Sequence, residues 1–314
     1  MQETNSNKNP NDFDYEIDLR EIFYALWEGK WIIVSLTTFA SIAGVIYSLS
    51  LSNIYESKAI LVPVNATSGL TGALRSYGGV AGFAGINLSP GNDEGNSAKS
   101  IKKVGSLSFF ENNVLANIHL PDLMAVKSWN SRTNTMTFDE SIYDNNSNTW
   151  IRDFSYPQQQ IPSAQESYEV FKQHFSLSED TKSGFITMSI RHQSPFIAKQ
   201  WVELIVNEIN AFYRQKDRLE SEKAVSYLNQ QISITGFSEI KQVIAELLQE
   251  ETKKLTLIEA NQYYVFDYID PPVVMERKSG PKRSLICIVS ALLGGMLSVL
   301  LVLIRHYVFI KKTS

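Results

Sequence analysis

Two apolar stretches near the ends of the chain, Trp31–Leu51 and Ser284–Ile304, contain no Asp, Glu, Lys or Arg. Each is about 21 residues long, and a helix that rises about 1.5 Å per residue would then match the roughly 30 Å hydrocarbon core of a bilayer. The pattern predicts two transmembrane helices. It places one large domain, residues 52–283, on one side of a membrane, and two short tails, residues 1–30 and 305–314, on the other side.

Three segments of the central domain have the residue pattern of strands. They are residues 55–64, residues 184–192 and residues 264–274. The second segment alternates apolar and polar positions with a period of two, which is typical of a half-buried strand. Because the first and third segments adjoin the two apolar stretches, we expect a mixed sheet that forms a base close to the membrane.

Two long helices are predicted between the second and third strands. Ser194 and Pro195 form a typical helix start, and the apolar spacing then continues over residues 194–233, which is roughly 60 Å of helix. Gly236 ends this helix, and a second helix is predicted over residues 238–262. Two consecutive long helices joined by a tight turn predict an antiparallel hairpin that projects from the base. Together these elements predict an α+β membrane protein.

The remaining segments give weaker patterns. Helices are predicted over residues 97–120, ended by Pro121, and over residues 164–175, with loops and a short strand or two over residues 128–163. A short amphipathic helix, with Asp18 and Glu21 in the pattern of a capping box, precedes the first apolar stretch. Residues 66–95 are rich in Gly, Ala and Ser. This stretch is interpreted either as a flexible linker or as a segment that packs against a neighbouring subunit.

Composition and charge exclude several classes of function. The formal net charge is −4, and no basic patch interleaved with aromatic residues offsets it, so a nucleic-acid partner is not expected. The single cysteine, Cys287, lies within the second apolar stretch, so no disulfide can form within the chain. Lys and Arg residues near the spans are balanced between the tails and the loop. The positive-inside rule therefore does not decide the orientation.

A search for catalytic and ligand-binding motifs finds none. The four histidines, His119, His174, His192 and His306, show no metal-ligand spacing, and there is no phosphate-binding glycine loop. Asp267 and Asp270 are interpreted as surface and turn residues rather than as an acid–base pair. The sequence therefore predicts a protein that is not an enzyme, with no catalytic residue, metal site or cofactor.

Small residues recur at four-residue spacing in both apolar stretches. This spacing lets helix backbones approach closely, and it predicts helix association within the chain or between subunits. The residues concerned are Ala40, Gly44 and Ser48 in the first stretch, and Ser290, Ala291, Gly294, Gly295 and Ser298 in the second.

Four segments together resemble the Wzz-type polysaccharide co-polymerases, the chain-length determinants of lipopolysaccharide O-antigen. They are the N-terminal DYEIDLREIFYALWEGKW, the small-residue GGVAGFAGINL, the helix start SPFIAKQWVELIVNEIN and the run DYIDPPVVMERKSGPKRSLICIVSALLGG. The resemblance covers nearly the whole chain. The last run is the most specific, and it contains the proline-rich residues Pro271, Pro272, Ser279 and Pro281.

This resemblance implies a location, an assembly and partners. The chain would lie in a bacterial inner membrane with two passes, with both tails cytoplasmic and the main domain periplasmic. Protomers would form a closed ring as a homo-oligomer. The ring would act with a membrane O-antigen polymerase and the lipid-linked growing polysaccharide, and it would set the modal chain length without catalysis. Only residues 305–314 follow the second apolar stretch, so the cytoplasmic kinase of the capsule-exporting branch is not expected.

Three rival interpretations share the two-span layout. A sensor would need a cytoplasmic output domain, and an export adaptor would favour strict coiled-coil heptads, which are not present. The sequence also fits a co-polymerase for another glycan, such as enterobacterial common antigen, capsule or exopolysaccharide, which is the alternative to O-antigen.

Overall fold

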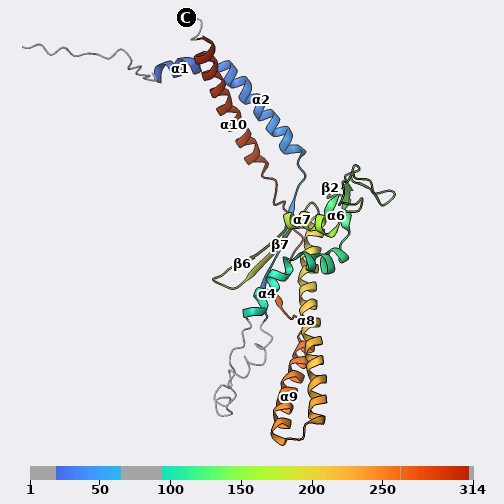
Figure 1. Ribbon diagram of the computed structural model, residues 1–314. Helices are drawn as coiled ribbons and strands as arrows, with labels where there is room; N and C mark the ends of the chain where they lie inside the picture. Colours follow the sequence, from blue (N-terminus) through green and yellow to red (C-terminus); the bar gives the residue numbers. More distant parts are fainter. Residues whose placement is uncertain (1–18, 65–93, 262, 311–314) are drawn as a thin grey trace, which may run out of the picture. The chain divides into compact units, whose positions relative to one another are not determined.

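The computed structural model describes residues 19–64, 94–261 and 263–310 (Figure 1). These residues form two compact units, one within residues 1–51 and 281–314 and the other within residues 52–280. The α+β fold class, with an apolar helix near each end and a long helix in the central unit, is confirmed. Asp18 and nearly all of the Gly/Ala-rich stretch lie outside the described residues.

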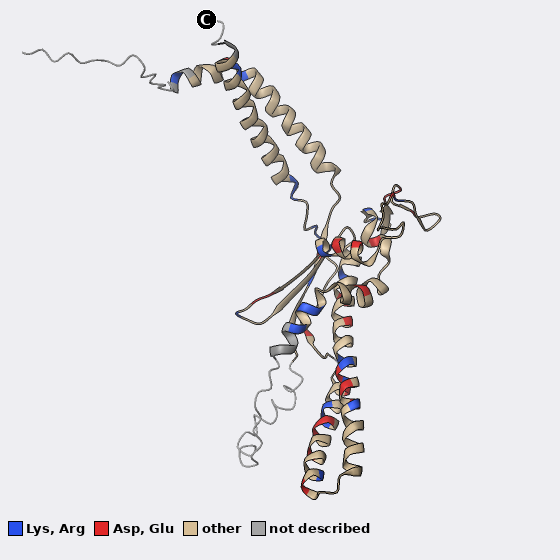
Figure 2. Cartoon of the chain, viewed as in Figure 1, with Lys and Arg blue, Asp and Glu red and all other residues tan. Residues whose placement is uncertain are grey.

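The first unit is helical. It contains α1 (Leu19–Glu28), α2 (Lys30–Ser50), α10 (Arg283–Ile304) and the π-helical turn η4 (Arg305–Ile310). Helices α2 and α10 run side by side (Figure 1). The span Lys30–Ser50 has a mean hydropathy of 1.9 and the span Arg283–Val308 has 2.7, so both are long and apolar enough to cross a membrane. Figure 2 shows Lys and Arg only towards the ends of these two helices.

The second unit is built on a four-stranded sheet. Its strands are β1 (Tyr55–Pro63), β6 (Phe175–Glu179), β7 (Ile186–His192) and β8 (Phe266–Asp270), in the order β6-β7-β1-β8. Every neighbouring pair is antiparallel. The prediction of a mixed sheet is therefore wrong. Strands β7 and β8 do run in the same direction, but β1 lies between them, so no parallel pair forms.

Strand β8 is shorter than the segment 264–274 in which a strand was predicted. It ends at Asp270, directly before Pro271 and Pro272. Proline has no backbone N–H to donate to a strand ladder, which explains why the pairing with β1 stops there. Strand β6 was not predicted, because its FSLSE sequence follows a helix without a turn signal.

The main core lies between one face of the sheet and the first half of α8 (Pro195–Ile234). Alternate residues of β1 and β7 are buried on this face, as expected for strands of period two. The buried residues of α8 recur every three or four positions and pack against them. The largest fully buried apolar side chains of these elements are Leu61, Ile186, Met188, Ile190, Ile205 and Ile209.

Beyond the core, α8 pairs with α9 (Ser238–Ala260) to form a helical hairpin (Figure 1). This part buries few side chains. Of the residues after Tyr213 in α8, only Ser221 is buried, and in α9 only Ile244 and Ile258 are buried. Charges of both signs cover the hairpin (Figure 2). The Arg218 guanidinium lies 2.8 Å from the Glu222 carboxylate on α8 and 3.2 Å from the Glu259 carboxylate on α9.

The helix predicted over residues 97–120 is divided into shorter pieces, which corrects that expectation. The structure has α4 (Glu94–Val104), α5 (Leu107–Phe109), the π-helical η2 (Phe110–Val114) and the 3-10 turn η3 (Leu115–Asn117). The division begins at Gly105, after which the Ser106 hydroxyl caps α5 by accepting a hydrogen bond from the Phe109 N–H. Pro121 lies in the first turn of α6 (Leu120–Met124), where a proline is well tolerated.

Two β-hairpins and one further helix complete the second unit. The hairpins pair β2 (Val126–Asn130) with β3 (Thr135–Phe138), and β4 (Tyr143–Asp144) with β5 (Thr149–Trp150). Helix α7 (Ala164–His174) begins at Ser163, whose hydroxyl accepts a hydrogen bond from the Glu166 N–H.

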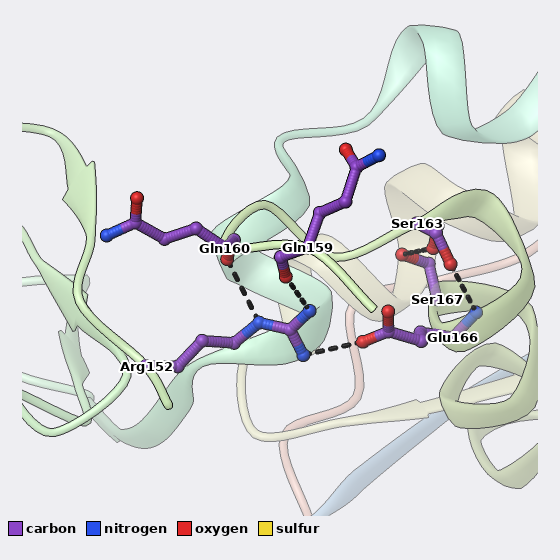
Figure 3. Close-up of polar contacts among 6 residues, drawn as sticks. All are labelled: Arg152, Gln159, Gln160, Ser163, Glu166 and Ser167. Carbon is purple, nitrogen blue, oxygen red and sulfur yellow. Dashed lines mark hydrogen bonds and ion pairs between the residues drawn. The ribbon is translucent and has the colours of Figure 1, made fainter. Parts of the chain in front are cut away.

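Arg152 fixes the loop between β5 and α7 (Figure 3). Its Nε donates to the Gln160 carbonyl over 3.0 Å, and its Nη1 forms an ion pair with Glu166 over 2.5 Å. This guanidinium lowers the pKa of the Glu166 carboxyl below its ordinary value. The loop is therefore held to the first turn of α7.

Candidate functional site at the apolar helix pair

The faces that α2 and α10 present to each other consist mainly of small residues. The buried positions are Gly44 and Ser48 on α2, and Gly294, Ser298 and Val302 on α10. Residues four apart lie on one helix face, so each set forms a single stripe. The large apolar side chains point away from the partner helix, and Phe39 and Met296 are 71% and 70% exposed.

This arrangement is the reverse of that in a water-soluble helix pair, in which large apolar side chains fill the interface. Helices in a bilayer gain nothing by hiding large apolar side chains from lipid, so small residues that permit close backbone approach are favoured between them. The distribution therefore supports two helices that pack inside a membrane.

Two glycines within the helices make close contacts across the pair. A Cβ atom added at Gly294 would overlap the Cβ of Ala40, and one added at Gly44 would overlap the side chain of Ser290. The two contacts follow opposite orders along the two helices, as required by an antiparallel pair. No side chain larger than hydrogen fits at either glycine without moving the partner helix.

The eight small residues singled out in the sequence have different positions. Ala40, Gly44, Ser290 and Gly294 lie in these two contacts, and Ser48 and Ser298 are buried. Ala291 and Gly295 are half-buried. A Cβ at Gly295 would lie 3.8 Å from the Thr37 hydroxyl, which is an ordinary contact distance.

Sequence reasoning missed three residues of the interface because it considered only Gly, Ala and Ser at four-residue spacing inside the spans. Thr37, three residues before Ala40, contributes a hydroxyl that lies 3.5 Å from the Ser298 hydroxyl. Gly29 lies against the side chain of Val302, four residues after Ser298. Extending the stripe on α2 by one turn and admitting Thr would have found Thr37. Gly29 lies before the predicted span and Val302 is a larger residue, so small-residue spacing within the spans gives no signal for them.

The proline-rich segment before α10 lies along the start of β1. The Ser279 N–H and hydroxyl both donate to the Ile54 carbonyl, over 2.8 Å and 3.2 Å, and the Ile54 N–H donates to the Gly280 carbonyl over 3.0 Å. Pro272 is buried and Pro271 is exposed. In the helical unit, the Pro281 carbonyl accepts from the Arg283 N–H over 3.0 Å at the start of α10. Ser279 thus fastens the two ends of the central unit together.

His192 is a buried titratable group of the central unit. It is 1% exposed, its Nε2 is 2.9 Å from the Asp122 carbonyl, and its Nδ1 accepts from the Ser194 N–H over 2.9 Å. Burial lowers the pKa of His192 to about 4, so the ring is neutral at pH 7. This pattern fits a structural histidine that joins α6, β7 and the start of α8.

The other chemical candidates remain apart from one another. His174 lies 6.3 Å from His192, ring to ring, and its Nδ1 bonds to the Arg191 carbonyl. Asp267 accepts a hydrogen bond from the Tyr268 N–H, and Asp270 is exposed at the end of β8. Within the described residues, no group of three or more His, Cys, Asp or Glu side chains is placed to hold a metal ion.

Family comparisons match the two ends of the chain. The family model for Wzz, the chain length determinant protein, matches residues 15–101. The chain carries a chain length determinant domain. A second model, GNVR, a G-rich domain described on tyrosine kinases, matches residues 239–307. The chain length determinant match includes α2 and β1, and the GNVR match includes β8 and all of α10. The matched segments therefore pair with each other in both units.

Solved structures also resemble the chain that carries this domain. One is a full-length bacterial polysaccharide co-polymerase, with 15% identity and a TM-score of 0.40 over 92% of this chain and 98% of that chain. Another is a fragment of WzzB, a polysaccharide co-polymerase from Salmonella Typhimurium, with 13% identity and a TM-score of 0.33 over 73% of this chain and 100% of that chain. A comparison with curated proteins gave no match.

Proposed function

We propose that this protein sets the chain length of a surface polysaccharide, as a co-polymerase that forms and breaks no bonds itself. The chain length determinant match over residues 15–101 carries this proposal. The antiparallel packing of α2 and α10 supports it, because it supplies a compact membrane anchor. The glycan we favour is lipopolysaccharide O-antigen. Enterobacterial common antigen, capsule and exopolysaccharide are the alternatives.

The proposed location is a bacterial inner membrane, with α2 and α10 as the two passes and residues 52–283 in the periplasm. The proposed partners are a membrane polymerase and the growing polysaccharide on its lipid carrier. The outward faces of α2 and α10, which carry exposed Phe39 and Met296, are the surfaces we assign to lipid and to the polymerase. The protein would bias the length at which polymerisation of the glycan ends, by holding the polymerase and the glycan in a fixed arrangement.

A ring of identical subunits is the proposed working form. The far end of the helical hairpin supports self-association, because it exposes apolar side chains that a monomer would leave in water. Ile234 and Phe237 are each 70% exposed, and Val243 is 55% exposed. Several large apolar side chains exposed at one end of a hairpin are typical of an interaction site.

The test is the size distribution of surface polysaccharides from a strain that lacks the gene and from the same strain carrying it on a plasmid. Loss of a preferred O-antigen length, restored by the plasmid, is the expected result. If O-antigen is unchanged, the same strains are assayed for common antigen, capsule and exopolysaccharide. An unchanged size distribution for all four would contradict the proposed function.

A further inference from the structure

The central unit contains an open cleft of about 450 Å³. It lies between the two β-hairpins, and its volume is within the range of about 300–1,000 Å³ that is usual for ligand sites. Its apolar part is formed by Met136 and Phe138 of β3, Tyr143 of β4 and Ile151 after β5. Ile151 is 47% exposed, so part of this apolar surface faces solvent.

Polar side chains without internal partners surround this apolar surface. Among the described residues, the Glu140 carboxylate and the side-chain amides of Asn145 and Asn146 line the cleft and make no hydrogen bond. A carboxylate accepts hydrogen bonds, and an amide both donates and accepts. A sugar presents hydroxyl groups that need both functions, together with C–H faces that pack on apolar surface.

The charge of the cleft selects against anions. Asp144 and Glu140 line it, and none of its described lining residues is Lys or Arg. Hydrogen bonds from the Ser147 hydroxyl and the Asn146 N–H lower the pKa of the Asp144 carboxyl, so this group is charged at neutral pH. A phosphate or a uronic acid would therefore be repelled, whereas an uncharged polyhydroxyl ligand would not.

The walls of the cleft are held in place before any ligand binds. The Tyr143 hydroxyl lies 3.1 Å from Asn148 Oδ1, which braces the hairpin of β4 and β5. Ile151 directly precedes Arg152, whose guanidinium is fixed by Glu166 and the Gln160 carbonyl (Figure 3). A site held in this way loses little conformational entropy on binding.

We propose that the cleft bounded by Phe138, Ile151, Asn145 and Asn146 binds a short, uncharged stretch of the polysaccharide. This inference rests on the proposed function and names the part of the protein that contacts the glycan. Binding would be weak, because a few neutral hydrogen bonds and a small apolar surface contribute little each. Weak binding suits a surface that a moving polymer contacts repeatedly.

The test is saturation-transfer NMR on the full-length protein in detergent micelles. The probe is a mixture of uncharged oligosaccharides released by mild acid from the surface polysaccharide of the host strain. A heparin-derived tetrasaccharide serves as the anionic comparator. We expect transfer to the uncharged probe only. We also expect at least about a fivefold loss of affinity in an Asn145→Ala, Asn146→Ala double variant, since hydrogen bonds from two side-chain amides are lost.

Asn229→Ala is the matched control, because Asn229 is an exposed asparagine on α8, outside the residues that line the cleft. Circular dichroism checks that all variants are folded. The proposal is overturned by no transfer in the wild type, by equal affinity in the double variant, by an equal loss in the control, or by equal transfer to the anionic comparator. Because the gene-deletion test does not depend on this cleft, a preferred length lost on deletion with no binding here would overturn only the cleft assignment.

Discussion

One methyl group added at Gly294 is expected to separate α2 from α10, whereas the same group added at Gly295 is not. A Cβ at Gly294 overlaps the Cβ of Ala40, and the backbone Cα atoms of Thr37 and Ala40 lie 3.6 Å and 3.8 Å away, so no flexible side chain can move aside. A Cβ at Gly295 has only the Thr37 hydroxyl at 3.8 Å. Overpacking of this kind costs about 1–3 kcal/mol. The equilibrium constant for close pairing of α2 with α10 should then fall by about 5- to 150-fold.

A cross-linking assay measures this pairing in the full-length protein. Cys287 is replaced by Ser, and cysteines are introduced at Thr37 and Ser298, whose hydroxyl oxygens lie 3.5 Å apart. Oxidation should form a disulfide rapidly in this background and in Gly295→Ala, but slowly in Gly294→Ala.

A compensating change separates overpacking from a general loss of folding. Combining Gly294→Ala with Ala40→Gly returns one methyl group of space at the contact, and it should restore the rate of disulfide formation. Equal rates for the two single alanine variants, or a double variant as slow as Gly294→Ala alone, would refute the proposed register of the helix pair.

Three further predictions concern the central unit. His192 has a native pKa of about 4, below its ordinary value of 6.5, so its contribution to stability is complete above about pH 6.5, and roughly 3 kcal/mol of it is lost by pH 4. Chemical denaturation across this pH range should show this loss in the wild type and not in His192→Gln. Burial raises the pKa of Asp122, which opposes the trend equally in both proteins. Asn210→Ala should lower the free energy of unfolding by about 3 kcal/mol, because Asn210 Oδ1 accepts from the N–H groups of residues 264–266 and its Nδ2 donates to the Phe266 carbonyl. A loss no larger than that of the exposed Asn229→Ala variant in the same denaturation assay would contradict this prediction. Arg152→Met should lower the free energy of unfolding by about 1–3 kcal/mol and speed limited proteolysis between residues 152 and 163, because charged hydrogen bonds hold that loop. An unchanged cleavage rate would contradict this role of Arg152.

Long periodic patterns made the helical elements of this fold predictable. The structure has helices at Pro195–Ile234 and Ser238–Ala260, close to the ranges 194–233 and 238–262 expected from the sequence. Each has a long run of apolar spacing and a clear end signal. Residues 97–120 also show apolar spacing, but Gly105 and the cap at Ser106 divide the segment, and the spacing continues through the break.

The sheet order and the interface contacts could not be predicted from local patterns. The position of β1 between β7 and β8 depends on the return of the helical hairpin to the sheet, which no single segment encodes. At the helix pair, residue size identified Gly294 and Gly295 alike. Only the helix register distinguishes the tight contact at Gly294 from the loose one at Gly295. The cleft between the β-hairpins joins segments too short to give a strand pattern.

The most direct test of the account is the band intensity of the surface polysaccharide against the number of repeats, on gels from the deletion strain and the complemented strain. With no regulator, a constant chance of termination at each step gives intensities that fall steadily with length. We predict a steady fall in the deletion strain, and a peak at a preferred length when the gene is restored. A peak of the same position and height in both strains would contradict it.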